Sequence, residues 1–231
     1  MKVNLEIKNL IKNSKSSYTS IISNINKKFK IELSKSTISY YKRSRDRITN
    51  IHLENVEEKD LEWLKGLFIA DGCKFVERRY AYTIKLALDK NKDKSILNKL
   101  KEILKGLGCK FSIKTEGNIF VIRLFSKTLF NILPNKNKPY IPREPLSFLA
   151  GLIDGDGCKK GNSAILVQYR NISMLRYLSN LFGLKVTVTR VKTNYGKSIR
   201  RQYYIPRYVC DLIRDMKLSE KLKGPIAQHG R

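Results

Sequence analysis

An apolar segment that ends in Asp-Gly occurs twice in this chain. The first copy, Leu64–Gly72, reads LKGLFIADG, and the second, Leu149–Gly157, reads LAGLIDGDG and follows 85 positions later. The similarity extends to both sides, because an aromatic residue precedes each copy and Cys-Lys follows each. Two matched segments of this kind predict a duplicated structural unit built around an apolar helix.

Small residues within both copies favour direct packing of the two helices. Glycine or alanine recurs about one helical turn apart, which allows two helix backbones to approach closely while the larger apolar residues surround them. Each helix is expected to stop at its final glycine, Gly72 or Gly157. Asp71 and Asp156 would then lie together at two helix C-terminal ends.

Two carboxylates in that position predict a metal site. Helix dipoles and mutual repulsion destabilise bare carboxylates there, and a divalent cation relieves both effects. Oxygen ligands suit Mg²⁺, with Mn²⁺ as an alternative, and such metals promote phosphodiester hydrolysis. One Asp-Gly alone would more often cap or pack a helix end, whereas the matched pair favours catalysis. The predicted metal ligands are Asp71, Asp156 and the backbone of Ala70 and Gly155.

The charge of the chain indicates a polyanionic partner. Lys and Arg number 47 against 20 Asp and Glu, so the net charge is +27. The stretch Gly157–Cys210 contains 11 Lys or Arg interleaved with tyrosines and no acidic residue. This pattern suits phosphates, sugars and bases, so a nucleic acid is the partner that the charge pattern favours. An acidic membrane surface is the alternative, but no lipid-anchor motif, membrane-length apolar run or strongly amphipathic basic helix supports it.

Cysteine usage indicates a reduced compartment. The four cysteines are isolated from one another and the chain has only two histidines, so neither disulfides nor a zinc site is expected. No continuous apolar segment follows the basic N-terminal residues as it would in a signal peptide. We expect an intracellular protein, cytoplasmic or, in a eukaryote, organellar.

The N-terminal residues predict a small helical domain. Apolar spacing indicates helices over Leu5–Lys12 and Tyr18–Phe29 and a third that begins near Ser34 or Ser36, with Ile38 directed inward. The sequence from 33 to 43 resembles the recognition helix of helix-turn-helix domains. A helical cap with a solvated basic face is the alternative. The candidate DNA contacts are Lys35, Ser36, Ser39, Tyr40, Lys42 and Arg43.

Two similar series of elements follow this domain. In the first, a strand is predicted over Tyr80–Asp89, then a helix closed by Gly108, strands at 109–114 and 119–125, and a helix over Lys127–Leu133. In the second, the matching ranges are Ala164–Arg170, Ser173–Phe182, Lys185–Lys192, Gln202–Ile205 and Arg207–Met216, with a long turn at Thr193–Ser198. The predicted organisation is a helix-turn-helix-like domain at 1–50, a linker at 51–60, a first repeat at 61–133, a proline-rich linker at 134–145, a second repeat at 146–216 and a basic tail at 217–231.

The paired motifs resemble those of the LAGLIDADG homing endonucleases in their single-chain, two-repeat form. The resemblance covers about residues 61 to 216. It implies an α+β fold in which two pseudo-symmetric αββαββα units form a DNA-binding saddle, here joined to a small all-α N-terminal domain. It also implies a site-specific endonuclease that cuts both strands of a long DNA target. We expect a monomer, because one chain contains both halves of the two-fold site.

The resemblance also implies further site residues. Polar or basic residues near the metals order water, and the matching positions are Asp89 and Lys90 in the first repeat, Gln168 in the second, and the basic pair Lys127 and Arg207. Simple phosphate contacts are the alternative for the basic residues. The candidate base readers or phosphate anchors on the sheets are Arg79, Thr83, Lys85, Arg123, Gln168, Arg170, Arg190, Lys192, Arg201 and Gln202.

Three positions in the motifs affect this interpretation. Lys65 stands where the family usually has a small residue, and we expect it to extend toward solvent or tilt the helix packing. Asp154 has Ile69 as its counterpart, so a structural role is expected for Asp154. Both predicted metal-binding aspartates are intact, which favours activity. A non-catalytic DNA-binding transcriptional regulator and an RNA-binding intron maturase remain the alternatives, and cleavage assays and DNA–RNA competition distinguish them.

Overall fold

The computed structural model describes residues 5–43, 51–77, 81–136, 138–169, 173–193 and 196–223. The chain divides into two compact units, Met1–Ile48 and Thr49–Arg231. Within the described ranges, no helix is both long enough and apolar enough to cross a membrane. The candidate DNA-binding residues Arg79 and Arg170 and the side chain of Arg43 lie outside the described part.

The first unit consists of α1 (Leu5–Asn13), α2 (Tyr18–Phe29) and α3 (Lys35–Arg43). Ser17 caps α2, because its hydroxyl accepts a hydrogen bond from the backbone N–H of Ser20 at 3.3 Å. The three helices enclose a small apolar core. The buried side chains of this core are Ile7, Ile11, Ile21, Ile25, Leu33 and Ile38.

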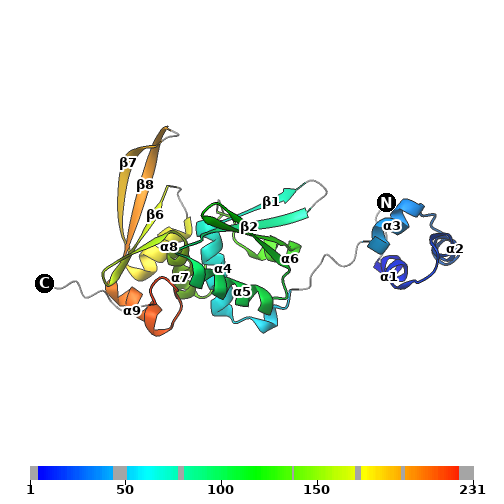
Figure 1. Ribbon diagram of the computed structural model, residues 1–231, viewed down its shortest axis with the longest axis horizontal. Helices are drawn as coiled ribbons and strands as arrows, with labels where there is room; N and C mark the ends of the chain where they lie inside the picture. The colour runs from blue at the N-terminus through cyan, green and yellow to red at the C-terminus, as the bar shows by residue number, and fades with distance from the viewer. Residues whose placement is uncertain are drawn as a thin grey trace. The chain divides into compact units, whose positions relative to one another are not determined.

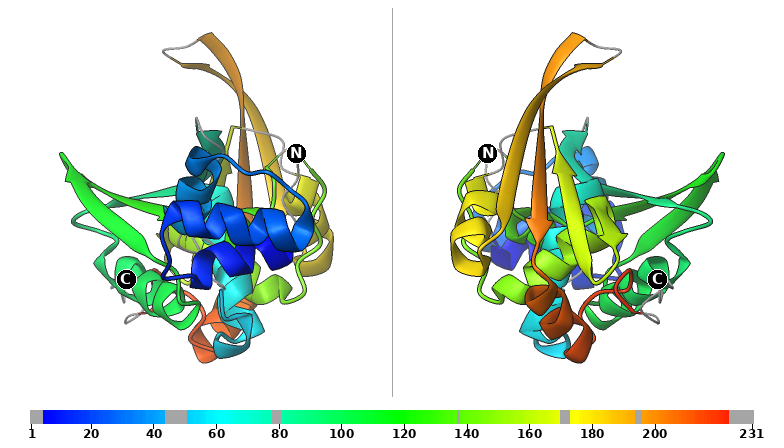
Figure 2. Two further views of the ribbon diagram at one scale, coloured as in Figure 1. Left: turned by 90° about the vertical axis from the view of Figure 1, so that its right-hand side faces the viewer. Right: turned by 90° about the vertical axis from the view of Figure 1, so that its left-hand side faces the viewer.

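The second unit is organised around two motif helices, α4 (Glu58–Asp71) and α7 (Pro145–Asp156), which pack side by side (Figure 1). Each motif helix leads directly into an antiparallel four-stranded sheet. The first sheet has the order β1 (Gly72–Glu77), β2 (Ala81–Asp89), β4 (Ile119–Phe125) and β3 (Phe111–Glu116). The second has the order β5 (Gly157–Lys160), β6 (Ser163–Gln168), β8 (Gly196–Ile205) and β7 (Lys185–Thr193). The two sheets diverge from the motif helices (Figure 2).

The remaining helices complete the two repeats. They are the 3₁₀ turn η1 (Leu53–Asn55), α5 (Lys94–Gly106), α6 (Lys127–Ile132), α8 (Ser173–Phe182) and α9 (Arg207–Asp215). One continuous apolar core unites α5, α6, α8 and α9 with the motif helices and the inner faces of both sheets. The predicted α+β fold with two equivalent repeats is confirmed.

Strands β1 and β5 were not predicted from hydrophobic periodicity, although the family resemblance implied both. β5 has only four residues, and exposure along β1 does not alternate regularly, so neither strand has a clear period-two pattern. Their register shows the duplication clearly, because Gly72 pairs with Leu86 and Gly157 pairs with Leu166.

The β7–β8 hairpin is longer than predicted. Thr193 pairs with Gly196, so the strand predicted to begin at Gln202 begins six residues earlier and the expected long turn is short. The hairpin extends beyond the rest of its sheet (Figure 1). The projecting ends have no core to cover, which explains why few apolar residues marked them as strands.

Both motif helices end without a left-handed residue, contrary to the expectation of a glycine C-cap. Gly72 and Gly157 are extended, with φ of −98° and −83°, and each begins a strand. Steric crowding by the preceding helical turn explains instead why both positions are glycine. A Cβ at Gly72 would lie 2.3 Å from Cδ2 of Phe68, and one at Gly157 would lie 2.4 Å from the carbonyl oxygen of Ile153.

Lys65 does not extend to solvent as expected. Its side chain is buried, and Nζ donates a hydrogen bond to Oε1 of Glu62 at 2.7 Å. The hydroxyl of Tyr140 donates to the same oxygen at 2.6 Å. The lysine is therefore part of a buried polar cluster that joins α4 to the segment before α7.

Candidate functional site

Glycines at the α4–α7 contact bring the two backbones together. A Cβ at Gly66 would lie 2.1 Å from the carbonyl oxygen of Phe148, and one at Gly151 would lie 2.1 Å from that of Trp63. Trp63 and Phe148 are equivalent positions of the two repeats, so the contact has two-fold symmetry. No larger residue fits either position unless the helices separate.

The contact places Asp71 and Asp156, the last residues of the two helices, in one half-buried acidic site. A Cβ at Gly155 would lie 2.9 Å from Oδ2 of Asp71, so this carboxylate rests against the opposite helix. Burial, together with the nearby negative charge of Asp156, raises the pKa of Asp71 to about 7. Burial also raises the pKa of Asp156, and a hydrogen bond from Gln168 opposes that rise.

Two lysines that sequence analysis missed flank the aspartates. Nζ of Lys136 donates to the carbonyl oxygen of Ala70 at 3.3 Å, and Nζ of Lys221 donates to that of Gly155 at 2.7 Å. Both ammonium groups lower the pKa values of the two aspartates. The lysines are 85 positions apart, as the motifs are, and each sits in the pattern Leu-x-x-Lys-x-Lys. That pattern is the signal that could have identified them.

Gln168 reaches the same site from β6. Its side-chain amide donates a short hydrogen bond to Oδ2 of Asp156. Because Leu86 and Leu166 pair with the equivalent motif glycines, the first-repeat counterpart of Gln168 is Leu88, which is buried. The two halves of the site are therefore chemically different.

The donor groups at the site fit a hard divalent cation that retains much of its water. Asp71 and Asp156 supply carboxylate oxygens, and no group of three His, Cys, Asp or Glu side chains suited to a metal occurs in the described part of the chain. The backbone oxygens of Ala70 and Gly155, which were predicted as metal ligands, accept hydrogen bonds from lysines. Water and substrate oxygens would complete the coordination, which is typical of Mg²⁺.

The other candidate catalytic residues lie in different surroundings. Oδ1 of Asp89 accepts hydrogen bonds from the backbone N–H groups of Asn91 and Lys92 at 2.9 and 3.0 Å, and these bonds lower its pKa. Asp89 therefore shapes the turn after β2, and the adjacent Lys90 is exposed.

The basic pair predicted near the metals is not brought to the aspartates. Nζ of Lys127 lies 5.5 Å from the ring centroid of Tyr82. On β2, Tyr82 lies four residues before Leu86, which pairs with Gly72 beside Asp71. Four strand residues span about 13 Å, so Lys127 is well separated from this aspartate. Nε of the exposed Arg207 lies 3.5 Å from Oδ2 of Asp211.

On the first sheet, the candidate DNA contacts share the face turned away from the core, but they differ in exposure. Lys85 and Arg123 are cross-strand partners on this face, and Arg123 is ion-paired with Glu77. Thr83 is fully buried, because its two cross-strand neighbours are Phe75 and Phe125. Thr83 therefore does not reach the surface as a base reader would.

On the second sheet, the register divides the candidates between two faces. Arg201 is on the face of the buried Tyr203, where it pairs with Gln168 and Val188. On β7, the exposed Arg190 and Lys192 are two and four residues after Val188, so they lie on that same face. Gln202 is on the opposite face. Arg200 and Lys185, which were not predicted as DNA contacts, also lie there.

In the first unit, α3 presents most of its candidate contacts to solvent. Lys35, Ser36 and Tyr40 are exposed and Ser39 is partly so, whereas Ile38 is buried as predicted. Lys42 is tied to the start of α2, because its Nζ donates to the carbonyl oxygen of Ser16 at 2.8 Å.

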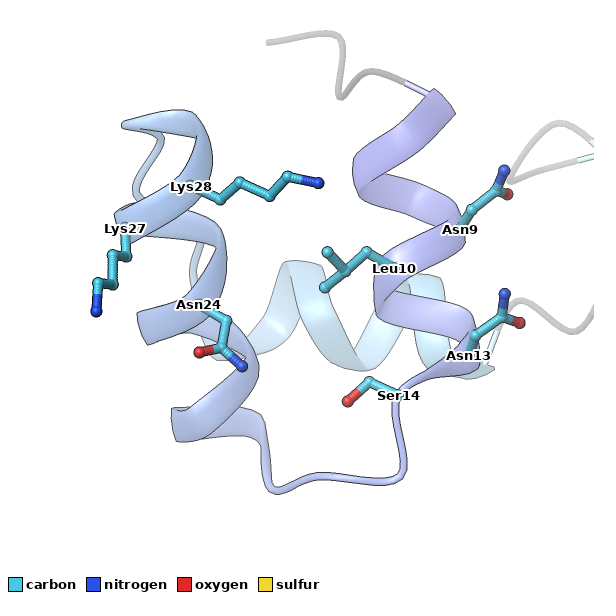
Figure 3. Close-up of a pocket in the computed structure, with 7 residues that line it drawn as sticks. All are labelled: Asn9, Leu10, Asn13, Ser14, Asn24, Lys27 and Lys28. Carbon is cyan, nitrogen blue, oxygen red and sulfur yellow. The ribbon is translucent and has the colours of Figure 1, made fainter.

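An open pocket between α1 and α2 is a separate feature of the first unit (Figure 3). No Asp, Glu, His or Cys is among the residues that line it. The lining residues are Asn9, Leu10, Asn13, Ser14, Asn24, Lys27 and Lys28.

Residues 58–127 match the family model of a LAGLIDADG-like domain. The match spans motif helix α4 and all four strands of the first sheet. No curated protein sequence matches the chain. The first repeat therefore resembles a LAGLIDADG-like domain, in agreement with the resemblance of the paired motifs.

Solved structures of the homing endonuclease I-DmoI share the fold of this chain at low sequence identity. The homing endonuclease I-DmoI, in complex with DNA and Ca, aligns with 17% identity and a TM-score of 0.53, over 74% of this chain and 94% of that chain. A variant of I-DmoI, in complex with its target DNA in the presence of Mg, aligns with 19% identity and a TM-score of 0.52, over 70% and 96%. The N-terminal LAGLIDADG domain of DUF199/WhiA aligns with 14% identity and a TM-score of 0.46, over 97% and 95%.

Proposed function

We propose that this chain is a divalent-metal-dependent endonuclease that cuts both strands of duplex DNA at a long, specific site. The observation that carries the proposal is the convergence of Asp71 and Asp156 from equivalent helix ends, each beside a lysine of matching position. I-DmoI, which shares the fold, is a homing endonuclease whose structures include target DNA with Ca, Mg or Mn.

In this proposal the two aspartates hold the cations, and the residues around them prepare the site. A divalent cation bound there would polarise the scissile phosphate and lower the pKa of a water molecule. Gln168 orients the Asp156 carboxylate by hydrogen bonding. Lys136 and Lys221 offset the negative charge of the carboxylates and of the approaching phosphate.

The duplex would bind along the two sheets. A net charge of +27 supplies long-range attraction to phosphates. Lys85 and Arg123 on the first sheet, and Arg200 and Gln202 on the second, lie on the faces opposite the helices. Side chains on alternate strand positions can contact consecutive base edges or phosphates. The single chain already contains both half-sites, so the proposed active form is a monomer.

Cleavage of a randomised duplex library in Mg²⁺ or Mn²⁺ tests the proposal. We expect discrete double-strand cuts that Asp71→Asn and Asp156→Asn each abolish. Asp215→Asn, which changes an exposed acid at the end of α9, is the matched control and should cut normally. The recovered sequences would also provide the target duplex for later measurements.

A non-catalytic regulator is the second candidate, and the exposed face of α3, which carries Lys35, Ser36 and Tyr40, favours it. This alternative predicts tight duplex binding without cutting, unchanged by Asp71→Asn or Asp156→Asn. An RNA-binding maturase would instead show preferential competition by intron RNA over duplex DNA. Either result would replace the endonuclease proposal.

A further inference from the structure

Asp154 is a buried carboxylate whose partners come from two distant parts of the chain. It has no exposed surface, and its oxygens accept hydrogen bonds from Nε1 of Trp63 at 2.7 Å and from the hydroxyl of Ser219 at 2.5 Å. The backbone N–H groups of Glu220 and Lys221 each donate to it at 2.9 Å. A buried charge requires this degree of hydrogen bonding, because an unpaired carboxylate in the core would be strongly destabilising.

Three of these donors belong to the irregular segment 218–223, which follows α9. The same segment is held from a second direction, because Nζ of Lys99 donates to the carbonyl oxygen of Leu218 at 2.7 Å. Lys99 also lies over the ring of Trp63, at 4.5 Å from the centroid. Trp63, Lys99 and Asp154 together fix the path of the chain past the end of α7.

That path determines the position of Lys221. The backbone of Lys221 is bonded to Asp154, and its Nζ donates to the carbonyl oxygen of Gly155 at 2.7 Å, one residue before Asp156. Both ends of Lys221 are therefore attached to α7, the backbone N–H to Asp154 and the ammonium group to Gly155. This arrangement holds the ammonium group beside the acidic site.

The first repeat reaches a similar arrangement without a carboxylate. Its counterpart of Asp154 is Ile69, which is buried in the apolar core. The matching lysine, Lys136, lies between α6 and α7, and both of these elements are packed against the core. The segment after α9 has no following motif helix in the described chain, and the hydrogen bonds to Asp154 take that anchoring role.

We propose that Asp154 is a positioning residue that holds Lys221 at the second half of the acidic site and so supports cleavage there. The inference rests on the proposed endonuclease function. Asp154 itself does not touch the substrate. Its effect on the reaction passes through the backbone of residues 219–221, so it should disappear when Lys221 is already replaced.

The anchoring can be tested without any DNA, by amide hydrogen exchange of the full-length protein. Asp154→Asn keeps the shape of the side chain but replaces one acceptor oxygen with a donor. We expect faster exchange in peptides covering 218–223 and unchanged exchange in α4. Ser219→Ala, which removes one bond without altering the motif helix, should give a smaller change. Unchanged protection of 218–223 in both variants would overturn the proposal.

The catalytic consequence is tested by a double-mutant cycle on the duplex recovered from the cleavage library. Asp154→Asn should lower the single-turnover cleavage constant about tenfold with little change in DNA affinity, which is a common effect of outer-shell substitutions. It should slow the same strand that Lys221→Met slows. The pair of substitutions should be no worse than Lys221→Met alone.

Lys136→Met supplies the matched comparison, because its effect should multiply with that of Asp154→Asn. The positioning role would be rejected if the effects of Asp154→Asn and Lys221→Met on the cleavage rate multiplied. It would also be rejected if Asp154→Asn slowed cleavage of both strands equally and weakened DNA binding. A wild-type chain that binds duplex DNA but cuts no member of the library would instead refute the endonuclease function and, with it, the role in cleavage. The hydrogen-exchange result would then still decide whether Asp154 anchors the segment.

Discussion

Gln168 donates a hydrogen bond to Asp156, whereas the position equivalent to Gln168 in the first repeat is held by the apolar Leu88. The difference extends to the neighbouring strand, where Arg201 pairs with Gln168 and Phe120 pairs with Leu88. Two aspartates related by a duplication therefore titrate in unlike surroundings. This asymmetry, together with the packing that brings the two halves together, should determine how the site responds to substitution and to pH.

Replacing Gln168 with Leu should make the second half-site resemble the first. The hydrogen bond from Gln168 lowers the pKa of Asp156, so its loss should raise that pKa. Metal binding requires the ionised carboxylate, so the rising limb of the cleavage–pH profile should move to higher pH. Leu88→Gln is the reciprocal control and should not move the limb upward. An unchanged profile for Gln168→Leu would contradict the assignment.

The stability of the metal-free protein should fall as the pH rises from about 4 to about 7. The pKa of Asp71 is raised from 3.8 to about 7, so the folded state binds more protons than the unfolded state in this window. Its contribution is complete below pH 4 and is lost as the pH passes 7. Thermal unfolding should show this slope for the wild type and a flatter one for Asp71→Asn.

Mg²⁺ should reverse this loss above pH 7. A ligand that binds only the folded state raises the unfolding temperature by mass action. At pH 8 we expect Mg²⁺ to raise the Tm of the wild type and to leave that of Asp71→Asn nearly unchanged. An equal increase in both proteins would place the metal elsewhere.

Replacing Gly66 or Gly151 with Ala should lower the free energy of unfolding by about 3 kcal/mol or more, at or above the upper end of the usual cost of overpacking. Each added Cβ would clash with a backbone carbonyl oxygen, and only movement of a whole helix could relieve that clash. Gly161→Ala is the control. Gly161 has a φ of +57° but no atom within 4 Å of the added Cβ, so its cost should be only about 1 kcal/mol from backbone strain. Urea unfolding measures both. Equal costs would show that steric contact between the helices is unimportant.

Lys136→Met and Lys221→Met should each lower the cleavage rate constant by roughly 10- to 100-fold, which is typical of replacing a group that surrounds the metal ligands. DNA affinity should change little, because many other cationic side chains remain. Lys138→Met and Lys223→Met remove the next lysine of each Leu-x-x-Lys-x-Lys pattern and serve as controls. Single-turnover cleavage separates the two pairs, and equal slowing in all four would point to a general charge effect.

Arg200→Gln and Arg201→Gln should have different effects, although the two residues are adjacent. Arg200 lies on the face opposite the helices, so its loss should weaken duplex binding and reduce the slope of log affinity against log salt by about one. Arg201 neighbours Gln168, so its loss should chiefly lower the cleavage rate. Salt titrations and single-turnover rates distinguish them, and matching phenotypes would refute the division of faces.

The residues that sequence analysis identified correctly are those with strong periodic or repeated signals. The motif helices pair as predicted because apolar residues and glycines recur in register, and α8 has the predicted bounds. Asp71, Asp156 and Gln168 come together in one site. These features depend on local pattern or on the duplication itself.

Other features depend on tertiary neighbours that no local pattern reveals. Lys136 and Lys221 lie about 65 positions beyond their aspartates, in segments without regular structure. Thr83 follows a regular strand alternation, yet two flanking aromatic side chains bury it. Lys65 appeared unsuited to a core, but Glu62 and Tyr140 provide a buried partner and a ring.

The reciprocal contact at Gly66 and Gly151 has a consequence for engineering. The glycine of each motif helix packs against a backbone carbonyl oxygen of the other helix. The seam is self-complementary, as in a symmetric dimer, although one chain contains both sides. A chimaera that joins the second repeat to a duplicate of itself would keep this seam and the spacing between the aspartates. Duplicating the first repeat would not, because it would place Ala70 opposite Ala70, and a Cβ at Gly155 would already lie only 2.3 Å from the Cβ of Ala70.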